Sequence, residues 1–295
     1  MSNLISERPS HHWSKERLHA DVQRAVGGTL NLLREVSRFS EHLDPEFHAE
    51  WMVKRVQFLS YELQSEIHAD HSEAERLGLL NRFFFETKKF KCITDVSKLV
   101  DPSEAYRLNR VLSDRRGAPI ALELIYAYLA EKIGVSLDFV DLKPTCFLRW
   151  VEDGRSRFVD ITRGGSTLSS DELIETLHTR FRLTSFCNAS LLETYSFDTF
   201  LADYIRCLKS SIDVGHEPEK HLWLQDNLIS YQPSNLQLLG ERALLHRRLG
   251  NFKHALSDLK RYYAFHDRDR SPSELAKLYD ELVALLERGR PDAEF

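Results

Sequence analysis

One stretch of this 295-residue chain, residues 120–133, limits most strongly what the chain can fold into. Read as a helix, it carries large apolar or aromatic side chains on almost every side: Leu122, Leu124, Ile125, Tyr126, Tyr128 and Leu129. A helix that is apolar all round has to be buried on most of its sides. Pro119 suits its first turn, and Gly134 suits the left-handed residue that ends it. The longest apolar run, Leu122–Ala130, is interrupted by Glu123 and is too short to cross a bilayer, so the stretch predicts the central helix of a globular core.

Short strands are predicted directly after this helix. The segments 137–142, 146–151 and 157–161 are rich in aromatic and β-branched residues, which favour strands. Asp153 and Gly154 separate the last two segments and are typical of a hairpin turn. We therefore expect a small antiparallel sheet of three strands beside the buried helix.

Signals for the start of a helix border this region on both sides. Asp101 and Pro102 begin a helix that we expect to break at Gly117. Ser169, with Glu172 three residues later, forms a capping box that begins another helix after the sheet.

Apolar residues recur at helical spacing through both ends of the chain. We predict four parts, which are a disordered lead (1–12), a helical N-terminal part (13–100), a core (101–190) and a helical tail (191–295). The predicted fold class is α+β and predominantly helical, with a short antiparallel sheet in the core.

Composition narrows the range of partners. With 40 Lys and Arg against 45 Asp and Glu, the formal net charge is −5, which offers no broad attraction for nucleic acid or anionic lipid. We expect neither a nucleic acid nor a membrane as a direct partner. Cys92, Cys146, Cys187 and Cys207 are far apart, as in proteins of a reducing compartment, and no apolar signal segment follows Met1. We therefore expect a cytoplasmic protein.

Motifs for metal or cofactor binding are weak. His68 and His71 stand three residues apart on an expected helix face, without a nearby acidic third ligand, and we interpret them as solvated surface. Gly164 and Gly165 lack the strand–loop–helix context of a phosphate cradle and are expected to turn the chain. We predict no metal and no cofactor.

Two segments resemble a known family. Residues 108–175 contain the run from Leu108 to Leu122, a buried helix, and strands with Cys146, Phe147 and Asp160, and they resemble the SirB-type bacterial proteins. Residues 243–259, in which Gly250, Ala255 and Leu259 stand at the spacing of a helical hairpin, resemble a tetratricopeptide repeat. The resemblance covers roughly residues 79–287. It implies a transglutaminase-like core joined to a tetratricopeptide-like tail.

The resemblance also implies where catalytic groups would stand. In the transglutaminase-like superfamily a Cys opens the buried helix, and a His and an Asp lie on the following strands. These positions correspond here to Pro119, Cys146 and Asp160, so the nucleophile and the imidazole are both absent. We therefore expect no catalytic residues. The three vestigial positions should still converge, with Cys146 and Asp160 on one face of the sheet and Pro119 within about 10 Å of Cys146.

Cys146 and Asp160 each have a second interpretation. Cys146 is either an inert strand cysteine or a displaced nucleophile that Thr145 and Asp160 assist. Asp160 either takes part in that chemistry or is structural, capping the glycine turn that follows or pairing with Arg149 or Arg157.

The sequence therefore predicts a protein that leans away from enzymatic activity. We expect a degenerate transglutaminase-like scaffold that binds a protein or peptide partner through its helical tail. The alternative is a thiol-dependent hydrolase or acyltransferase that acts on peptide or amide bonds through Cys146.

Overall fold

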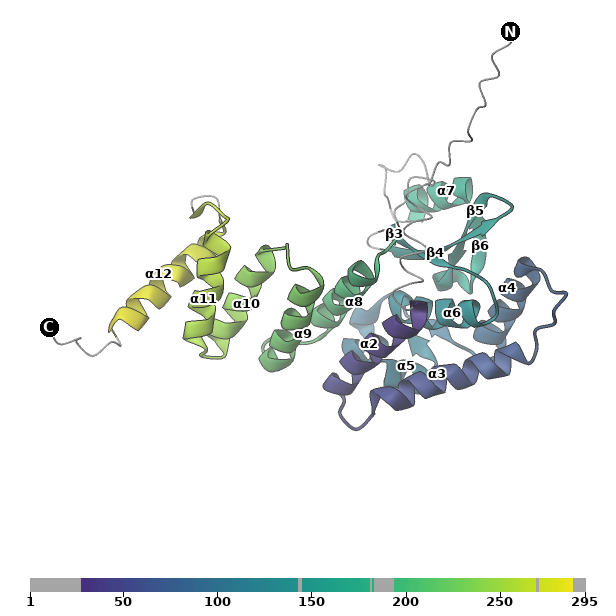
Figure 1. Ribbon diagram of the computed structural model, residues 1–295, viewed down its shortest axis with the longest axis horizontal. Coiled ribbons are helices and arrows are strands. Elements are labelled where there is room, and N and C mark those ends of the chain that lie inside the picture. Colours follow the sequence, from purple (N-terminus) through teal and green to yellow (C-terminus); the bar gives the residue numbers. More distant parts are fainter. Residues whose placement is uncertain (1–27, 143–144, 181, 183–193, 269–270, 289–295) are drawn as a thin grey trace, which may run out of the picture.

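The computed structural model describes residues 28–142, 145–180, 182, 194–268 and 271–288. Figure 1 shows two parts, a core of helices around a small sheet and a row of helices that extends away from it as a tail. The helices of the core are α2 (Gly28–Leu43), α3 (Ala49–Gln64), α4 (Glu73–Asn81), α5 (Leu108–Asp114), α6 (Pro119–Lys132) and α7 (Ser170–Arg180). The predicted fold class, α+β and predominantly helical, is confirmed.

Helix α6 is the centre of the core, as its sequence predicts. Every residue from Ile120 to Ala130 is buried. Helices α2, α3, α4 and α5 pack against α6, and so does strand β4 (Thr145–Glu152). Gly134 follows its last turn with a φ of +76°, the left-handed conformation predicted for it. Burying one leucine or isoleucine side chain stabilises a fold by roughly 1.5–3 kcal/mol, so this helix supplies a large part of the apolar driving force.

The sheet is an antiparallel meander in which each strand pairs with the next one along the chain. Its strands are β3 (Asp138–Leu142), β4, β5 (Arg155–Asp160) and β6 (Ser166–Ser169). Asp153 and Gly154 join β4 to β5 with φ values of 48° and 76°, which a tight hairpin turn requires. The prediction of three strands is incomplete, because β6 buries only Leu168 and lacks the apolar alternation that marks a strand.

The two faces of the sheet belong to different apolar clusters. The side chains in the main cluster with α6 are Leu148, Trp150 and Val159, and those in the cluster with α7 are Phe147, Phe158 and Leu168. The capping box predicted at Ser169 begins α7, because Glu172 accepts a hydrogen bond from the Ser169 N–H at 2.7 Å. The sheet is therefore covered on both faces.

The segment before α6 differs from the prediction. Asp101 does act as a cap, since its carboxylate accepts a hydrogen bond from the Ser103 N–H at 2.9 Å. The element that it begins is only a 3₁₀ turn, η3 (Pro102–Ala105), and α5 starts separately. Helix α5 ends before Gly117 because Arg115 adopts a left-handed φ of 56°.

A short parallel pair of strands precedes α6 and was not predicted. Strand β1 (Lys91–Cys92) pairs with β2 (Arg116–Gly117), and Cys92 lies opposite Gly117. This pairing carries Cys92 to the beginning of α6.

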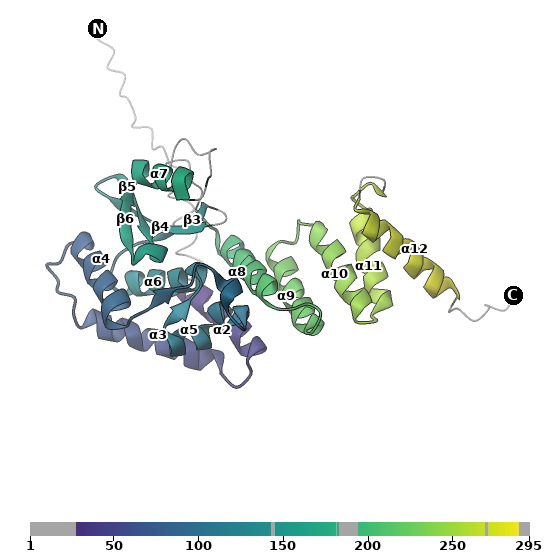
Figure 2. The same ribbon diagram turned by 180° about the vertical axis from the view of Figure 1, so that it is seen from behind.

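The tail is a succession of helices in which each packs against the next. They are α8 (Phe197–Ser211), α9 (Pro218–Tyr231), α10 (Gln237–Arg248), α11 (Phe252–Tyr263) and α12 (Ser273–Arg288). Figures 1 and 2 both show α10, α11 and α12 at the end of the molecule that is remote from the sheet. They enclose a cluster of their own in which Ala255 is fully buried.

Candidate functional site

The three superfamily positions lie on elements that contact one another. Pro119 is half-buried in the first turn of α6, Cys146 is the second residue of β4, and Asp160 is the fully buried last residue of β5. Strand β4 pairs with β5, and α6 packs against both β4 and the 3₁₀ turn η4 (Ile161–Arg163) that follows Asp160. The elements that carry the three positions therefore pack against one another.

The register of the sheet does not make Cys146 and Asp160 direct partners. Leu148 pairs with Val159, and continuing this register by one step puts Phe147 opposite Asp160. The side chains of Thr145 and Cys146 lie outside the described residues. Their orientation, and the separation of Pro119 from Cys146, stay predictions.

Asp160 is held by the backbone and by one arginine. Its Oδ1 accepts hydrogen bonds from the N–H and the hydroxyl of Thr162, at 2.9 and 2.5 Å, and so caps η4. Its Oδ2 accepts a hydrogen bond from Arg180 at 3.1 Å, and Arg180 also donates to the Thr162 hydroxyl at 2.9 Å. The interpretation of Asp160 as a cap of the following turn is confirmed. Its pairing with Arg149 or Arg157 is wrong, because those arginines pair with other carboxylates of the sheet.

The glycine turn after Asp160 fits tightly against α4. Gly164 and Gly165 have φ values of 70° and 77°, so they turn the chain as predicted. The Asn81 amide donates a hydrogen bond to the Gly165 carbonyl at 3.0 Å and accepts one from the Tyr126 hydroxyl at 2.7 Å. A Cβ at residue 165 would lie 1.9 Å from the Asn81 Oδ1, so only glycine fits there.

A cysteine that sequence reasoning did not connect with the site lies at the head of α6. Burial raises the pKa of the Cys92 thiol to about 12, the carboxylates of Glu123 and Asp160 add to the rise, and Arg180 opposes it. Cys92 is therefore close to both acids and is protonated at neutral pH. Because the thiolate is the reactive form, this environment suppresses nucleophilic character. The pairing of β1 with β2 has no local sequence signal through which Cys92 could have been found.

Glu123 is a second acid that sequence reasoning missed as a site residue. It lies one turn into α6 and is fully buried. Its charge also contributes to the pKa of Cys207 on α8, which burial raises to about 11. A buried carboxylate between two thiols opposes thiolate formation at both of them.

The described residues offer no cluster of three His, Cys, Asp or Glu side chains that could hold a metal ion. The expectation that His68 and His71 share a helix face is wrong. They lie in the turn between α3 and α4, where the His71 Nδ1 accepts a hydrogen bond from the His68 N–H at 3.2 Å. Within the same part of the chain, no helix combines the length and apolarity needed to span a bilayer.

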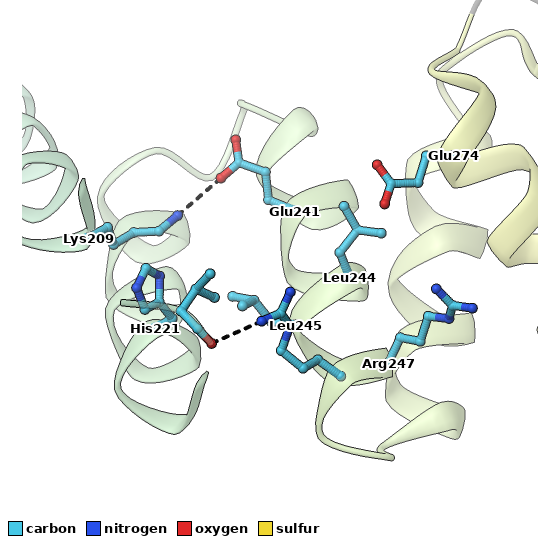
Figure 3. A pocket seen from close by; sticks show the side chains of 9 residues that line it. Lys209, His221, Glu241, Leu244, Leu245, Arg247 and Glu274 are labelled. Atoms are coloured by element: carbon cyan, nitrogen blue, oxygen red, sulfur yellow. Dashed lines mark hydrogen bonds and ion pairs between the residues drawn. The ribbon is translucent and has the colours of Figure 1, made fainter. Parts of the chain in front are cut away.

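A cleft with a volume of about 520 Å³ opens on the tail (Figure 3). Its lining residues are Lys209, Val214, His221, Glu241, Leu244, Leu245, Arg247, Arg248 and Glu274, which come from α8, α9, α10, α12 and the α8–α9 loop. Lys209 pairs with Glu241 at 3.1 Å across the cleft, and Arg248 donates a hydrogen bond to the Val214 carbonyl at 3.2 Å. The cleft thus has charged rims and an apolar floor that includes Leu244.

Comparisons with known proteins find relatives that align along most of the chain. A UPF0162 protein of Xylella fastidiosa strain Temecula1 is 25% identical over 262 residues, which cover 86% of this chain and 92% of the relative. A UPF0162 protein of Vibrio cholerae serotype O1 is 22% identical over 258 residues, covering 87% of this chain and 91% of the relative. No solved structure matches the chain significantly.

The profile of a protein family, described as the transglutaminase-like superfamily, matches residues 50–202. The match runs from α3 to α8, takes in the whole sheet and the head of α6, and covers more than half of the chain. The chain belongs to the transglutaminase-like superfamily.

Proposed function

We propose that this chain is a non-catalytic, SirB-type member of its superfamily that binds a segment of a protein partner in a reducing compartment such as the cytoplasm. The core is then a scaffold, and the binding surface lies on the tail. The competing function is a thiol-dependent hydrolase or acyltransferase in which Cys146 attacks a peptide or amide bond.

The state of the groups at the head of α6 carries this proposal. A transglutaminase-like site needs a thiolate where Pro119 stands. Cys92, which pairs with Gly117 two residues before Pro119, has a pKa raised to about 12. Asp160, which would orient a histidine, is engaged by Thr162 and Arg180 instead. These contacts favour a structural role for the site.

The cleft of the tail supports partner binding. Antiparallel neighbouring helices, with the buried Ala255 between them, are what a tetratricopeptide-like tail requires. An apolar floor between charged rims suits an extended peptide segment, because the apolar surface supplies affinity and the charges supply selectivity.

Site-resolved alkylation tests the non-catalytic half of the proposal. The intact protein is treated with limiting iodoacetamide at pH 6, and each cysteine is quantified by peptide mass spectrometry beside glutathione as the reference thiol. We expect no cysteine to react faster than glutathione. Rapid stoichiometric labelling of Cys146 that is lost in Asp160→Asn would establish the thiol-dependent enzyme instead.

Peptide selection tests the binding half. A library of random 15-residue peptides is selected on the wild-type chain, and binders are measured again on Leu244→Glu, which puts a charge on the cleft floor. We expect peptides that bind the wild type and lose roughly tenfold or more in affinity on the variant. Exposed Ser257→Glu on α11 is the matched control. If no peptide distinguishes Leu244→Glu from this control, the cleft is not the binding surface.

A further inference from the structure

Three large aromatic side chains lie exposed on the outer face of α3. Trp51 is 44% exposed, Phe58 is 54% exposed and Tyr61 is 66% exposed. They span ten residue steps of one helix, or about 15 Å at 1.5 Å per residue, and the steps of seven and three residues keep them on one side. We name Trp51, Phe58 and Tyr61 the aromatic stripe. Figure 1 shows α3 along the edge of the core, away from the sheet and the tail.

The aromatic stripe is not part of the main core. The opposite side of α3 carries the buried residues Met52, Val53, Val56, Leu59 and Leu63, which join the main core. The other exposed large apolar side chains in the described part of the chain stand singly on separate elements, as Phe265 and Val151 do. Isolated exposed apolar residues are ordinary, whereas several exposed aromatic side chains on one side of a helix mark an interaction surface.

Positive charge borders the aromatic stripe. Lys54 and Arg55 are exposed between Trp51 and Phe58, and neither forms a salt bridge among the described residues. Burial is the main cause that lowers the pKa of Arg115, and the charge of Arg55 lowers it further. The guanidinium of Arg115 therefore lies near that of Arg55.

Negative charge beside the stripe is largely compensated. Glu62 binds Lys88 at 2.7 Å, which leaves Glu50, in the first turn of α3, as the exposed carboxylate of this helix face. The border of the stripe is therefore basic although the chain as a whole has a charge of −5.

We propose that the aromatic stripe of α3 is a second docking surface, which takes an amphipathic helix of a partner protein with apolar residues flanked by Asp or Glu. Trp, Tyr and Arg are the residue types that dominate binding energy in protein interfaces, and all three are present here. The apolar residues of the partner cover Trp51 and Phe58. Its carboxylates meet Lys54 and Arg55.

This surface lies on the core and shares no residue with the cleft of the tail. The proposal therefore stands even if the tail binds no peptide, and variants of the two surfaces separate the two claims.

Two model peptides test the charge and the apolar contact together. Both are fluorescein-labelled helices of about 20 residues with Leu at steps of three and four, one flanked by Glu and the other by Lys. Binding to the intact chain is followed by fluorescence polarisation and by the emission of the tryptophans. We expect the Glu-flanked peptide to bind at least roughly tenfold more tightly than the Lys-flanked one.

Variants then assign the binding to the stripe. Phe58→Ala, and separately the exposed pair Lys54→Glu with Arg55→Glu, should each weaken binding of the Glu-flanked peptide roughly tenfold or more. Phe265→Ala removes an even more exposed aromatic side chain from the tail and is the control, for which we expect less than a twofold change. Equal binding of both peptides, or binding unchanged in Phe58→Ala, overturns the proposal.

Three other occupants would also overturn it. An oligo-dT strand of 20 nucleotides, or phosphatidylglycerol vesicles, bound more tightly than the peptide in a Phe58-dependent manner would assign the stripe to nucleic acid or lipid. Dimerisation of the wild type in sedimentation velocity that Phe58→Ala abolishes would assign it to a second copy of the chain.

Discussion

Two buried aspartates, one in the core and one in the tail, are paired with arginines in different ways. The side chain of Asp160 is 1% exposed and its partner Arg180 is 36% exposed, whereas the values are 5% for Asp258 and 19% for Arg242. Asp160 gives one oxygen to the cap of η4 and the other to Arg180. Asp258 gives both oxygens to Arg242, each at 2.7 Å.

Both pairs connect separate elements of the fold, but they connect different numbers of elements. Asp160 ties the end of β5 to its own turn and to the last turn of α7. Arg242 of α10 joins Asp258 of α11 to Asp226 of α9, and so links three successive helices. Only Asp160 stands at a position for which the resemblance implies a catalytic role. A buried carboxylate has to be hydrogen-bonded whatever its role, so its position alone is not evidence of chemistry.

The largest effect is expected in the tail. Arg242→Ala leaves Asp258 buried without its bidentate partner and should destabilise the tail by about 3–5 kcal/mol, measured by urea unfolding. The double variant with Asp258→Ala should recover part of this loss. Arg268→Ala, which breaks an exposed pair with Asp280, is the control and should change stability by less than about 1 kcal/mol. Equal effects of Arg242→Ala and Arg268→Ala would remove the contrast between buried and exposed pairs.

A matched pair of glycine variants measures how tightly the turn beside Asp160 is packed. Gly165→Ala meets Asn81 and also a left-handed φ, whereas Gly164→Ala meets only the left-handed φ. We expect losses of about 3 kcal/mol for Gly165→Ala and about 1–2 kcal/mol for Gly164→Ala in the unfolding of the core. Equal losses would show that α4 does not hold the turn.

Asp160→Asn should destabilise the core by about 2 kcal/mol, because it weakens hydrogen bonds to Thr162 and Arg180 without changing the shape of the side chain. Asp153→Asn, in the exposed hairpin turn, is the control and should stay within about 0.5 kcal/mol. A fully stable Asp160→Asn variant would mean that this carboxylate is not needed by the fold, and would reopen a functional role for it.

Local signals in the sequence predicted the local structure well. The apolar pattern of α6, the Asp153–Gly154 turn and the Ser169 capping box each act within a few residues, and each is found in the structure. The predicted helix from Asp101 was less accurate, because the cap begins only a 3₁₀ turn, and α5 starts separately at Leu108.

The site was harder to predict because its contacts are distant in the sequence. The bond of Asp160 to Arg180 spans 20 residues, and the arginine stands in an exposed last turn of α7, where charged residues are common. Cys92 reaches the head of α6 through a strand pair of two residues, which has no detectable periodicity. The resemblance to a family singled out Asp160 as a site residue. Its bonding partners, Thr162 and Arg180, could be identified only from the structure.

The pH dependence of Cys92 alkylation tests most directly the claim that the head of α6 is a structural site. Cys146, Cys187 and Cys207 are replaced by Ser, so that Cys92 is the single thiol, and the rate with iodoacetamide is measured from pH 6 to pH 10. With a pKa of about 12, the thiolate fraction at pH 8 should be roughly a thousandfold below that of a free cysteine, and the rate should rise across the whole range without a plateau. An alkylation rate that levels off with increasing pH, with a titration midpoint below pH 8, would contradict the account. Such a profile would reveal an activated thiol close to Glu123 and Asp160.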